Sequence, residues 1–331
     1  MIDRGIAVII IGRNEGNRLV RCLESVVSLA YPVVYVDSGS ADQSVEHALT
    51  AGAEVVELDP AEPFTAARAR NAGLEFALER HPDVEFVQFV DGDCELQPNW
   101  IETARVYLAK HSQVAVVCGR RREQNVNASI YNELIDLEWD TPIGEASACG
   151  GDSMMRVDAL RAVGGFDARM IAGEEPELCL RIRRHGFKVV RLDCEMTLHD
   201  ADLQRFGQMW RRFVRAGHAY AESVFLQGAD SDPAARRRLV SFIVWGGILP
   251  AMIVGSVLVV PVVGVFLPVL YLLQWTRIYR ARISTTVGRK AALYASACLI
   301  GKFAELEGAL RYLLNRYLRR RQTRLIEYKA T

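Results

Sequence analysis

The sequence lacks net charge. Its 331 residues include 40 lysines and arginines, balanced by 40 aspartates and glutamates. This balance argues against a nucleic-acid-binding protein that relies on bulk positive charge, so we expect no nucleic-acid partner. Charge of one sign gathers in the segment 316-RYLRRRQTR-324, which holds five arginines in nine residues.

Paired cysteine motifs are also missing. The seven cysteines form no C-x-x-C pair and show no spacing typical of a metal site. We therefore expect reduced, structural thiols in a cytoplasmic setting. The apolar run near the N-terminus is too short for a secretory signal and predicts a buried strand. The cysteines are Cys22, Cys94, Cys118, Cys149, Cys179, Cys194 and Cys298.

One long segment has no ionisable side chain of any kind. Residues 239–275 are 37 positions without Asp, Glu, Lys, Arg or His. As one helix they would extend roughly 55 Å, far beyond the ~30 Å hydrocarbon core of a bilayer. Two shorter passes of about 17 residues, with a turn near Pro261 and Gly264, fit better, although passes this short leave a re-entrant or buried hairpin open. Arginines at both ends predict that both ends face the cytoplasm: Arg236, Arg237, Arg238, Arg277, Arg280 and Arg282.

The first part of the chain alternates between apolar runs and helical patterns. Runs of strand length occupy residues 6–11, 32–36, 53–58, 84–90 and 114–118. Helical patterns occupy residues 18–29, 43–49, 66–79, 100–109, 130–139, 174–185 and 203–226. Continuous apolar strands separated by helices are typical of a mostly parallel sheet covered on both faces, an α/β fold.

This pattern predicts an α/β domain over residues 1–228 and a membrane region over residues 229–331. The membrane region contains the hairpin 239–275 and amphipathic helices over 288–320. In parallel sheets, ligands bind beyond the carboxyl ends of the strands. The residues that follow each apolar run are therefore the first candidates for a site.

Polar residues follow three of the apolar runs: 12-GRNE-15, 37-DSGS-40 and 91-DGD-93. We expect all three to face one rim of the sheet. Two carboxylates separated by one glycine suit a hard cation such as Mg²⁺ or Mn²⁺ shared with a diphosphate. A tripeptide of this kind on its own is more often an ordinary turn. Its position after a strand favours the site.

For other residues that could bind a ligand, an ordinary structural role explains the sequence equally well. Asp37 can accept from a base or a ribose, but Asp37 or Ser40 can also cap the next helix. No G-x-G-x-x-G is present, which argues against a dinucleotide cofactor. Arg68 and Arg70 point to different faces of a helix, and Arg70, followed by Asn71, is the better phosphate contact.

Two further groups lie later in the chain. Glu174 and Glu175 open a helix, where they can serve as a base or simply complement the helix dipole. His199 can join a metal or only pack. A basic aromatic helix face suggests contacts with a diphosphate or an acceptor, or snorkelling at a membrane; its residues are Trp210, Arg212 and Arg215.

The order of the motifs resembles the family 2 glycosyltransferases with the GT-A fold, in their membrane-associated bacterial type. The resemblance covers roughly residues 5–226. It is carried by 8-VIIIGRNEGNRLVRCLESV-26, 34-VYVDSGSADQSVE-46, 68-RARNAG-73, 89-FVDGDCEL-96, 149-CGGDSMMR-156, 164-GGFD-167 and 174-EEPELCLRIRRHG-186.

The resemblance implies a role for each matching residue. Glu175 is the expected catalytic base, with Glu174 as the alternative, and Asp93, Asp91 and His199 are the expected ligands of Mg²⁺ or Mn²⁺. The expected contacts to a nucleotide-sugar are Asn14, Glu15, Asp37, Ser38, Arg70, Asp91, Gly151 and Asp152. Two departures matter: the family's D-D-G-S is 37-DSGS-40 here, and its E-D is Glu174-Glu175.

The resemblance also implies an inverting, metal-dependent transfer of a sugar from a nucleotide-diphosphate donor, UDP-sugar before GDP-sugar. We expect the acceptor to be a hydroxyl or phosphate, lipid-linked or on an envelope saccharide, at the cytoplasmic membrane with the catalytic domain facing the cytoplasm. A nucleotidyltransferase is an alternative, but 12-GRNEG-16 is a poor match to its glycine-rich basic loop. A non-catalytic membrane scaffold is another, and the intact D-x-D and paired glutamates argue against it. Assembly of the chain into an oligomer stays an open alternative.

Overall fold

The computed structural model describes residues 5–27, 29, 31–259 and 261–318. The chain forms two compact units, and each is described by itself. The α/β unit comprises Met1–Asn125 and Glu138–Ala201, and the helical unit comprises Val126–Leu137 and Asp202–Thr331. Four arginines of the basic C-terminal segment, at 319, 320, 321 and 324, lie outside the described residues.

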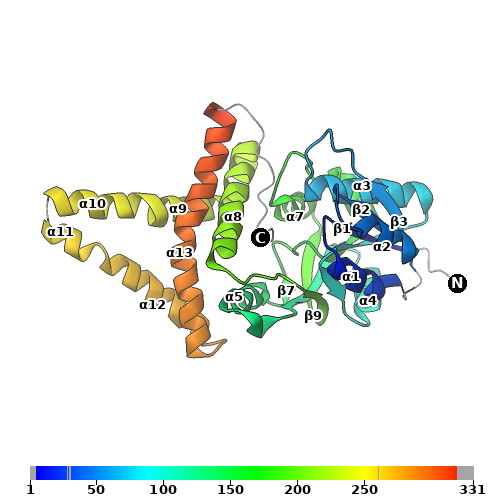
Figure 1. Cartoon of the computed structure of the whole chain (residues 1–331), viewed down its shortest axis with the longest axis horizontal. Helices are drawn as coiled ribbons and strands as arrows, with labels where there is room; N and C mark the ends of the chain where they lie inside the picture. Colours follow the sequence, from blue (N-terminus) through cyan, green and yellow to red (C-terminus); the bar gives the residue numbers. More distant parts are fainter. Residues whose placement is uncertain (1–4, 28, 30, 260, 319–331) are drawn as a thin grey trace. The chain divides into compact units, whose positions relative to one another are not determined.

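The α/β unit is built on one mixed sheet with the strand order β3-β2-β1-β4-β8-β6-β9-β5, and β7 pairs with β9 (Figure 1). The strands are β1 (Ile6–Gly12), β2 (Val33–Asp37), β3 (Glu54–Glu57), β4 (Phe86–Asp91), β5 (Cys94–Leu96), β6 (Val114–Glu123), β7 (Gly144–Glu145), β8 (Ser153–Arg156) and β9 (Lys188–His199). The helices between them are α1 (Asn17–Val27), α2 (Ser44–Thr50), α3 (Ala66–Arg80), α4 (Trp100–Lys110), α6 (Val157–Val163) and α7 (Glu174–Arg184).

The first four strands of this order run parallel, as the apolar runs predict. Register places Gly12 opposite Asp37 and Ile11 opposite Asp91, so the ends of β1, β2 and β4 meet at one rim. Helices cover both faces because the strands are apolar on both sides. The core on one face includes residues of α1, α2 and α4, and the core on the other includes residues of α3, α6 and α7.

The second half of the sheet departs from the predicted parallel pattern. β8 runs antiparallel to both β4 and β6, in a segment where the apolar runs predict no strand. Four residues are too short a run to show a strand period. β9 extends from Lys188 to His199 because it pairs with β6, β5 and β7. β6 likewise continues through arginines that resemble a loop in sequence, and Arg122 pairs with Glu195 at 2.7 Å.

The helical unit begins with α5 (Ile130–Trp139), which straddles the division between the two units. Its other helical elements are α8 (Phe206–Gln227), α9 (Pro233–Ile243), a π-helical turn (Val244–Ile248), α10 (Leu249–Val259), α11 (Pro261–Phe266), α12 (Val269–Ile283) and α13 (Gly288–Leu313).

The backbones of α8 and α13 nearly touch at two glycines. A Cβ on Gly217 would lie 1.9 Å from the Glu305 carbonyl oxygen, and one on Gly308 would lie 2.0 Å from that of Val214. This contact places α8 with the C-terminal helices, so the division at 201/202 differs from the predicted boundary at 228/229.

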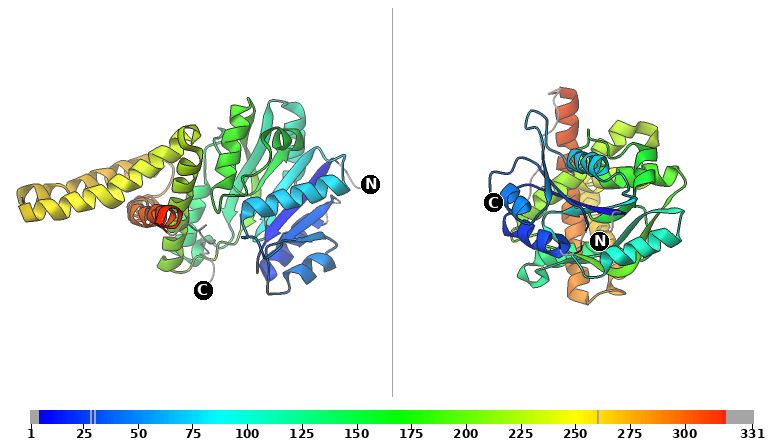
Figure 2. Two further views of the ribbon diagram at one scale, coloured as in Figure 1. Left: turned by 90° about the horizontal axis from the view of Figure 1, so that it is seen from above. Right: turned by 90° about the vertical axis from the view of Figure 1, so that its right-hand side faces the viewer.

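Within the helical unit, α10 and α12 form the two legs of a hairpin joined through α11 (Figures 1 and 2). The turn lies where the sequence placed it, near Pro261 and Gly264. In the described residues, one helix is long and apolar enough to cross a membrane, Pro233–Val257, and its most apolar 18-residue window has a mean hydropathy of 2.0. Large apolar side chains are exposed along the hairpin; they include Met252, Val254, Val257, Val262, Val265, Phe266, Leu272 and Leu273.

One buried polar contact ties α4 to the centre of the sheet. Trp100 Nε1 donates to Gln88 Oε1 at 2.7 Å, and Gln88 Nε2 donates to the Phe89 carbonyl oxygen at 2.7 Å. Trp100→Phe would leave the Gln88 oxygen buried without its donor. We expect the free energy of unfolding of the α/β unit to fall by about 1–3 kcal/mol, measured by urea titration followed by far-ultraviolet circular dichroism.

The double variant Trp100→Phe, Gln88→Leu is the control for this prediction. Because it removes both polar partners, its destabilisation should be smaller than the sum of the two single variants. A Trp100→Phe variant within about 0.5 kcal/mol of the parent would show that the contact is not needed.

Candidate active site

The loops that follow β1 and β2 hold each other in place. Asn14 has the left-handed φ of 55° that asparagine tolerates better than most residues. Its backbone N–H donates to Ser40 Oγ at 2.9 Å, and its Oδ1 accepts from the Ala41 N–H at 2.7 Å. Glu15 pairs with Arg18 at 3.0 Å, which anchors the same loop to α1. The two predicted nucleotide loops therefore form one surface.

Asp37 is buried at the end of β2. Its carboxylate accepts from Tyr35 Oη at 3.0 Å, from the Ser40 N–H at 2.8 Å and from the Ser40 hydroxyl. Burial, followed by the nearby charge of Asp37, raises the pKa of the Tyr35 hydroxyl, which therefore stays protonated and donating. Ser40 does not cap the next helix, which begins only at Ser44. Ser38 directly follows β2, and its N–H donates to the carbonyl oxygen of Gly12 at the end of β1, at 3.0 Å.

Arg70 links the end of β4 to the start of α7. Its Nη2 lies 2.7 Å from Asp91 Oδ1, and its Nη1 lies 2.6 Å from Glu174 Oε1. Burial alone would lower the pKa of Arg70, but Asp91 and Glu174 raise it, and it remains charged. Arg68 points elsewhere and donates to the Asp59 carbonyl at 3.0 Å. Of the two arginines, Arg70 is thus the one at the rim.

Asp152 lies fully buried behind Asp91. Its Oδ1 accepts from the Asp91 N–H at 2.9 Å, and its Oδ2 accepts from Thr197 Oγ1 at 2.9 Å and pairs with Arg121 at 2.8 Å. Gly151, which precedes Asp152, lies close to the side chain of Asp91, because a Cβ on Gly151 would lie 2.5 Å from Asp91 Oδ2. Any side chain at that position would displace the carboxylate of Asp91.

Arg121, Thr197 and Trp139 belong to this network and were missed in the sequence. The Arg121 guanidinium lies 5.4 Å from the Trp139 ring centroid, and the same ring meets His199 at 4.6 Å, edge-on. Arg121 follows the apolar run 114–118, and the rule that polar residues after a strand face the site would have found it. Thr197 and Trp139 carry no comparable signal, because their partners are distant in sequence.

Asp93 and His199 meet because β5 pairs antiparallel with β9, with Cys94 opposite His199. His199 Nε2 lies 3.3 Å from Asp93 Oδ2, and both side chains are buried. The buried Nδ1 of His199 forms no hydrogen bond within the described part of the chain and lies 3.9 Å from Glu123 Oε2. Asp93, Cys94 and His199 offer ligand atoms within 4.8 Å of one another. A carboxylate and an imidazole backed by a second carboxylate are a suitable donor set for a divalent cation.

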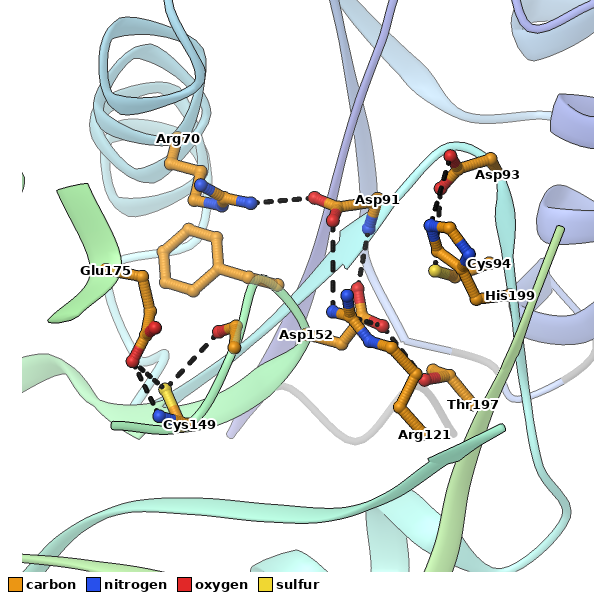
Figure 3. Close-up of polar contacts among 12 residues, drawn as sticks. Arg70, Asp91, Asp93, Cys94, Arg121, Cys149, Asp152, Glu175, Thr197 and His199 are labelled. Carbon is orange, nitrogen blue, oxygen red and sulfur yellow. Dashed lines mark hydrogen bonds and ion pairs between the residues drawn. The ribbon is translucent and has the colours of Figure 1, made fainter. Parts of the chain in front are cut away.

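Glu175 is buried beside the loop that contains Cys149 (Figure 3). Its Oε1 accepts from the Cys149 N–H at 2.6 Å and from the thiols of Cys149 and Cys179 at 3.0 Å each. Burial raises the pKa of Glu175, although these hydrogen bonds oppose the shift. A buried carboxylate with a raised pKa is a better proton acceptor than an exposed one.

Figure 3 shows three groups of side chains. Glu175 and Cys149 lie on one side and Asp93 and His199 on the other; Asp91, Asp152 and Arg121 lie between them. The predicted contacts Trp210, Arg212 and Arg215 belong instead to α8 of the helical unit, where Trp210 Nε1 donates to Glu307 Oε2 at 2.8 Å. Their contact with a diphosphate or an acceptor stays a prediction.

Comparison with known proteins identifies a family for this unit. The model of glycosyl transferase family 2 matches residues 7–164. Glycosyltransferase AglE of Haloferax volcanii is 25% identical over 72% of this chain and 79% of its own length. Pre-mycofactocin glycosyltransferase of Mycobacterium tuberculosis is 26% identical over 77% of this chain, which spans about half (53%) of that relative.

Solved structures share the fold at low identity. A mannosyltransferase from Pyrobaculum calidifontis, in complex with GDP-Man and Mn²⁺, matches with a TM-score of 0.58 and 16% identity over 94% of this chain and 88% of its own. Glucosyl-3-phosphoglycerate synthase from Mycobacterium tuberculosis, in complex with Mn²⁺, UDP-Glc and phosphoglyceric acid, matches with a TM-score of 0.50 and 16% identity over 67% of this chain and 79% of its own. Together with the mixed sheet and its flanking helices, these matches confirm the predicted fold class. Residues 7–164 of this chain therefore match the family 2 glycosyltransferases, and the α/β unit has the GT-A fold.

Proposed function

We propose that the chain is an inverting glycosyltransferase that moves a sugar from a nucleoside-diphosphate sugar to a hydroxyl or phosphate acceptor. The observation that carries this proposal is the ion-paired chain Glu174–Arg70–Asp91 at the carboxyl ends of the strands. It joins the predicted nucleotide loops and D-x-D to the start of α7, where Glu175 lies. In α/β sheets this edge is where ligands bind.

The nucleoside of the donor binds on the surface formed by Asn14, Asp37 and Ser38. Asp93 and His199 would hold the divalent cation, Mg²⁺ or Mn²⁺, with Asp91 close by. Such a cation neutralises charge on the leaving diphosphate. The mannosyltransferase neighbour contains Mn²⁺ with GDP-Man and the synthase contains it with UDP-Glc, which supports the assignment without deciding between UDP-sugar and GDP-sugar.

Glu175 is the base in this proposal. Three donors hold Oε1 of Glu175, which leaves its other carboxylate oxygen free to act as the base. This oxygen takes the proton of the acceptor hydroxyl while the hydroxyl oxygen attacks the anomeric carbon. Glu174 is the weaker choice because Arg70 already binds its Oε1. One base and a good leaving group suit a single direct displacement, which inverts the anomeric configuration.

The helical unit supports a membrane location. The exposed apolar side chains of α10–α12 would have no favourable partner in water, and arginines border them on both sides. We place the hairpin in the cytoplasmic membrane, spanning or re-entrant, with the catalytic unit on the cytoplasmic side. This location favours a lipid-linked acceptor or an envelope saccharide.

Glu175→Gln should lower kcat by about 10²- to 10⁴-fold with little change in the KM of the donor, because the amide cannot accept the proton. Turnover of labelled UDP- and GDP-sugars by the purified chain with membrane lipids measures this, with label counted in lipid and aqueous extracts. Since burial raises the pKa of Glu175, the parent should lose rate as the pH falls, at a higher pH than an exposed glutamate would give.

The matched control is Glu177→Gln, the same change on the same helix. Glu177 pairs with Arg181 at 2.6 Å and has no part in the proposed reaction. Full transfer by Glu175→Gln would refute the assignment of the base, and label found only in water-soluble product would refute the lipid acceptor.

Asp93→Asn should weaken Mn²⁺ binding by at least about tenfold, because the amide replaces an anionic ligand. Electron paramagnetic resonance of free Mn²⁺, with and without a nucleoside diphosphate, measures the affinity independently of turnover. Asp83→Asn, in an exposed turn of the same unit, is the control. Equal Mn²⁺ affinity in the parent and Asp93→Asn would place the cation elsewhere.

The double variant Val262→Lys, Val265→Lys should reduce binding to anionic vesicles in a flotation assay. Both valines are exposed at the end of the hairpin, and a lysine inside a bilayer costs about 3 kcal/mol. Leu49→Lys, which changes an exposed apolar residue of the α/β unit, should float like the parent. Undiminished flotation of the double variant would exclude insertion of the hairpin.

A further inference from the structure

Two cysteines that are distant in sequence meet at Glu175. Cys149 Sγ and Cys179 Sγ lie 3.7 Å apart, and each lies 3.0 Å from Glu175 Oε1. The three atoms therefore form a compact triangle of two sulfurs and one carboxylate oxygen.

The triangle is built on firm elements. Glu175 and Cys179 are four residues apart on α7, so their side chains share one face of the helix. Both are buried, and Cys149 is half-buried in the loop before β8. Cys149 is followed by Gly150 and Gly151, where a Cβ would face Arg121 and Asp91 respectively.

The distances suit a tetrahedral cation. With bonds of ~2.3 Å to sulfur and ~2.0 Å to oxygen, Zn²⁺ sets its sulfur ligands about 3.8 Å apart and its sulfur and oxygen ligands about 3.5 Å apart. The observed sulfur–sulfur distance of 3.7 Å nearly equals the first value. The two observed sulfur–oxygen distances of 3.0 Å are roughly 0.5 Å shorter than the tetrahedral value. Rotation of the Glu175 carboxylate away from the two sulfurs would supply this difference.

We propose that Cys149, Glu175 and Cys179 form a binding site for a thiophilic divalent cation, with Zn²⁺ as the representative ion. Binding releases the two thiol protons to solvent and leaves the fourth coordination position to water. The site differs in chemistry from the one at Asp93 and His199, because thiolates select Zn²⁺ over Mg²⁺ or Mn²⁺.

Occupancy of this site would inhibit transfer, a consequence that rests on the proposed role of Glu175 as the base. A carboxylate bound to Zn²⁺ is no longer a free proton acceptor. The inhibition should persist at saturating Mn²⁺, because the two cations use different ligands. The binding of the cation, by contrast, does not depend on what Glu175 does in catalysis.

Titration of the purified full chain with Co²⁺ tests the binding. A thiolate bound to Co²⁺ gives a near-ultraviolet charge-transfer band, which carboxylate and imidazole ligands do not give. We expect the band to saturate at about one Co²⁺ per chain, to disappear on addition of Zn²⁺, and to be lost in Cys149→Ser and in Cys179→Ser. Cys194→Ser, which alters a half-buried cysteine of β9 outside the cluster, should keep it.

Transfer assays with Zn²⁺ at saturating Mn²⁺ test the consequence. Zn²⁺ should inhibit the parent and Cys194→Ser at concentrations at least tenfold lower than those needed for Cys179→Ser. A charge-transfer band that survives in both cluster variants, or that never forms in the parent, overturns the site. A band of the expected behaviour without inhibition upholds the site and instead refutes Glu175 as the base.

Discussion

The guanidinium of Arg70 is the contact on which the rest of the site depends. It is buried, and it bridges a carboxylate at the end of β4 to one at the start of α7, 2.7 and 2.6 Å away. A buried charge persists only when it is paired, and removal of one partner of such a pair costs about 3–5 kcal/mol. The position of α7, and with it Glu175, is thereby coupled to the strand that ends in Asp91.

The mixed sheet explains how so many charged groups converge. Three parallel strands bring their carboxyl ends to one rim, and the antiparallel β8 delivers Gly151 and Asp152 to that rim from the opposite direction. β9 then brings Thr197 and His199 to the same place through its pairing with β5 and β6. Asp152, without access to water, is neutralised by Arg121 and fixed by Thr197. Each negative group at the rim is thus held by a neighbour before any ligand binds.

The parts of this site that follow apolar runs could be predicted from the sequence. Asp37, Asp91 and Asp93 each come directly after a buried strand, and a parallel sheet leaves them only one edge to share. The remaining parts could not be predicted, because distant pairings create them. Arg121 reaches Asp152 through the register of β6, and Cys149 reaches Cys179 only after α7 folds against the loop that precedes β8. The β8 strand itself is too short for its period to show.

The same geometry separates two kinds of potential metal-ligand side chain within one rim. Carboxylate and imidazole gather at Asp93 and His199, whereas sulfur gathers at Glu175. The alternating charges of Arg70, Asp91, Arg121 and Asp152 lie between them (Figure 3). The two arginines already pair with the intervening carboxylates, so a cation bound there would compete with Arg70 for Asp91 and with Arg121 for Asp152. In the proposed arrangement, the softness of a cation's preferred ligands would decide which end of the rim it binds.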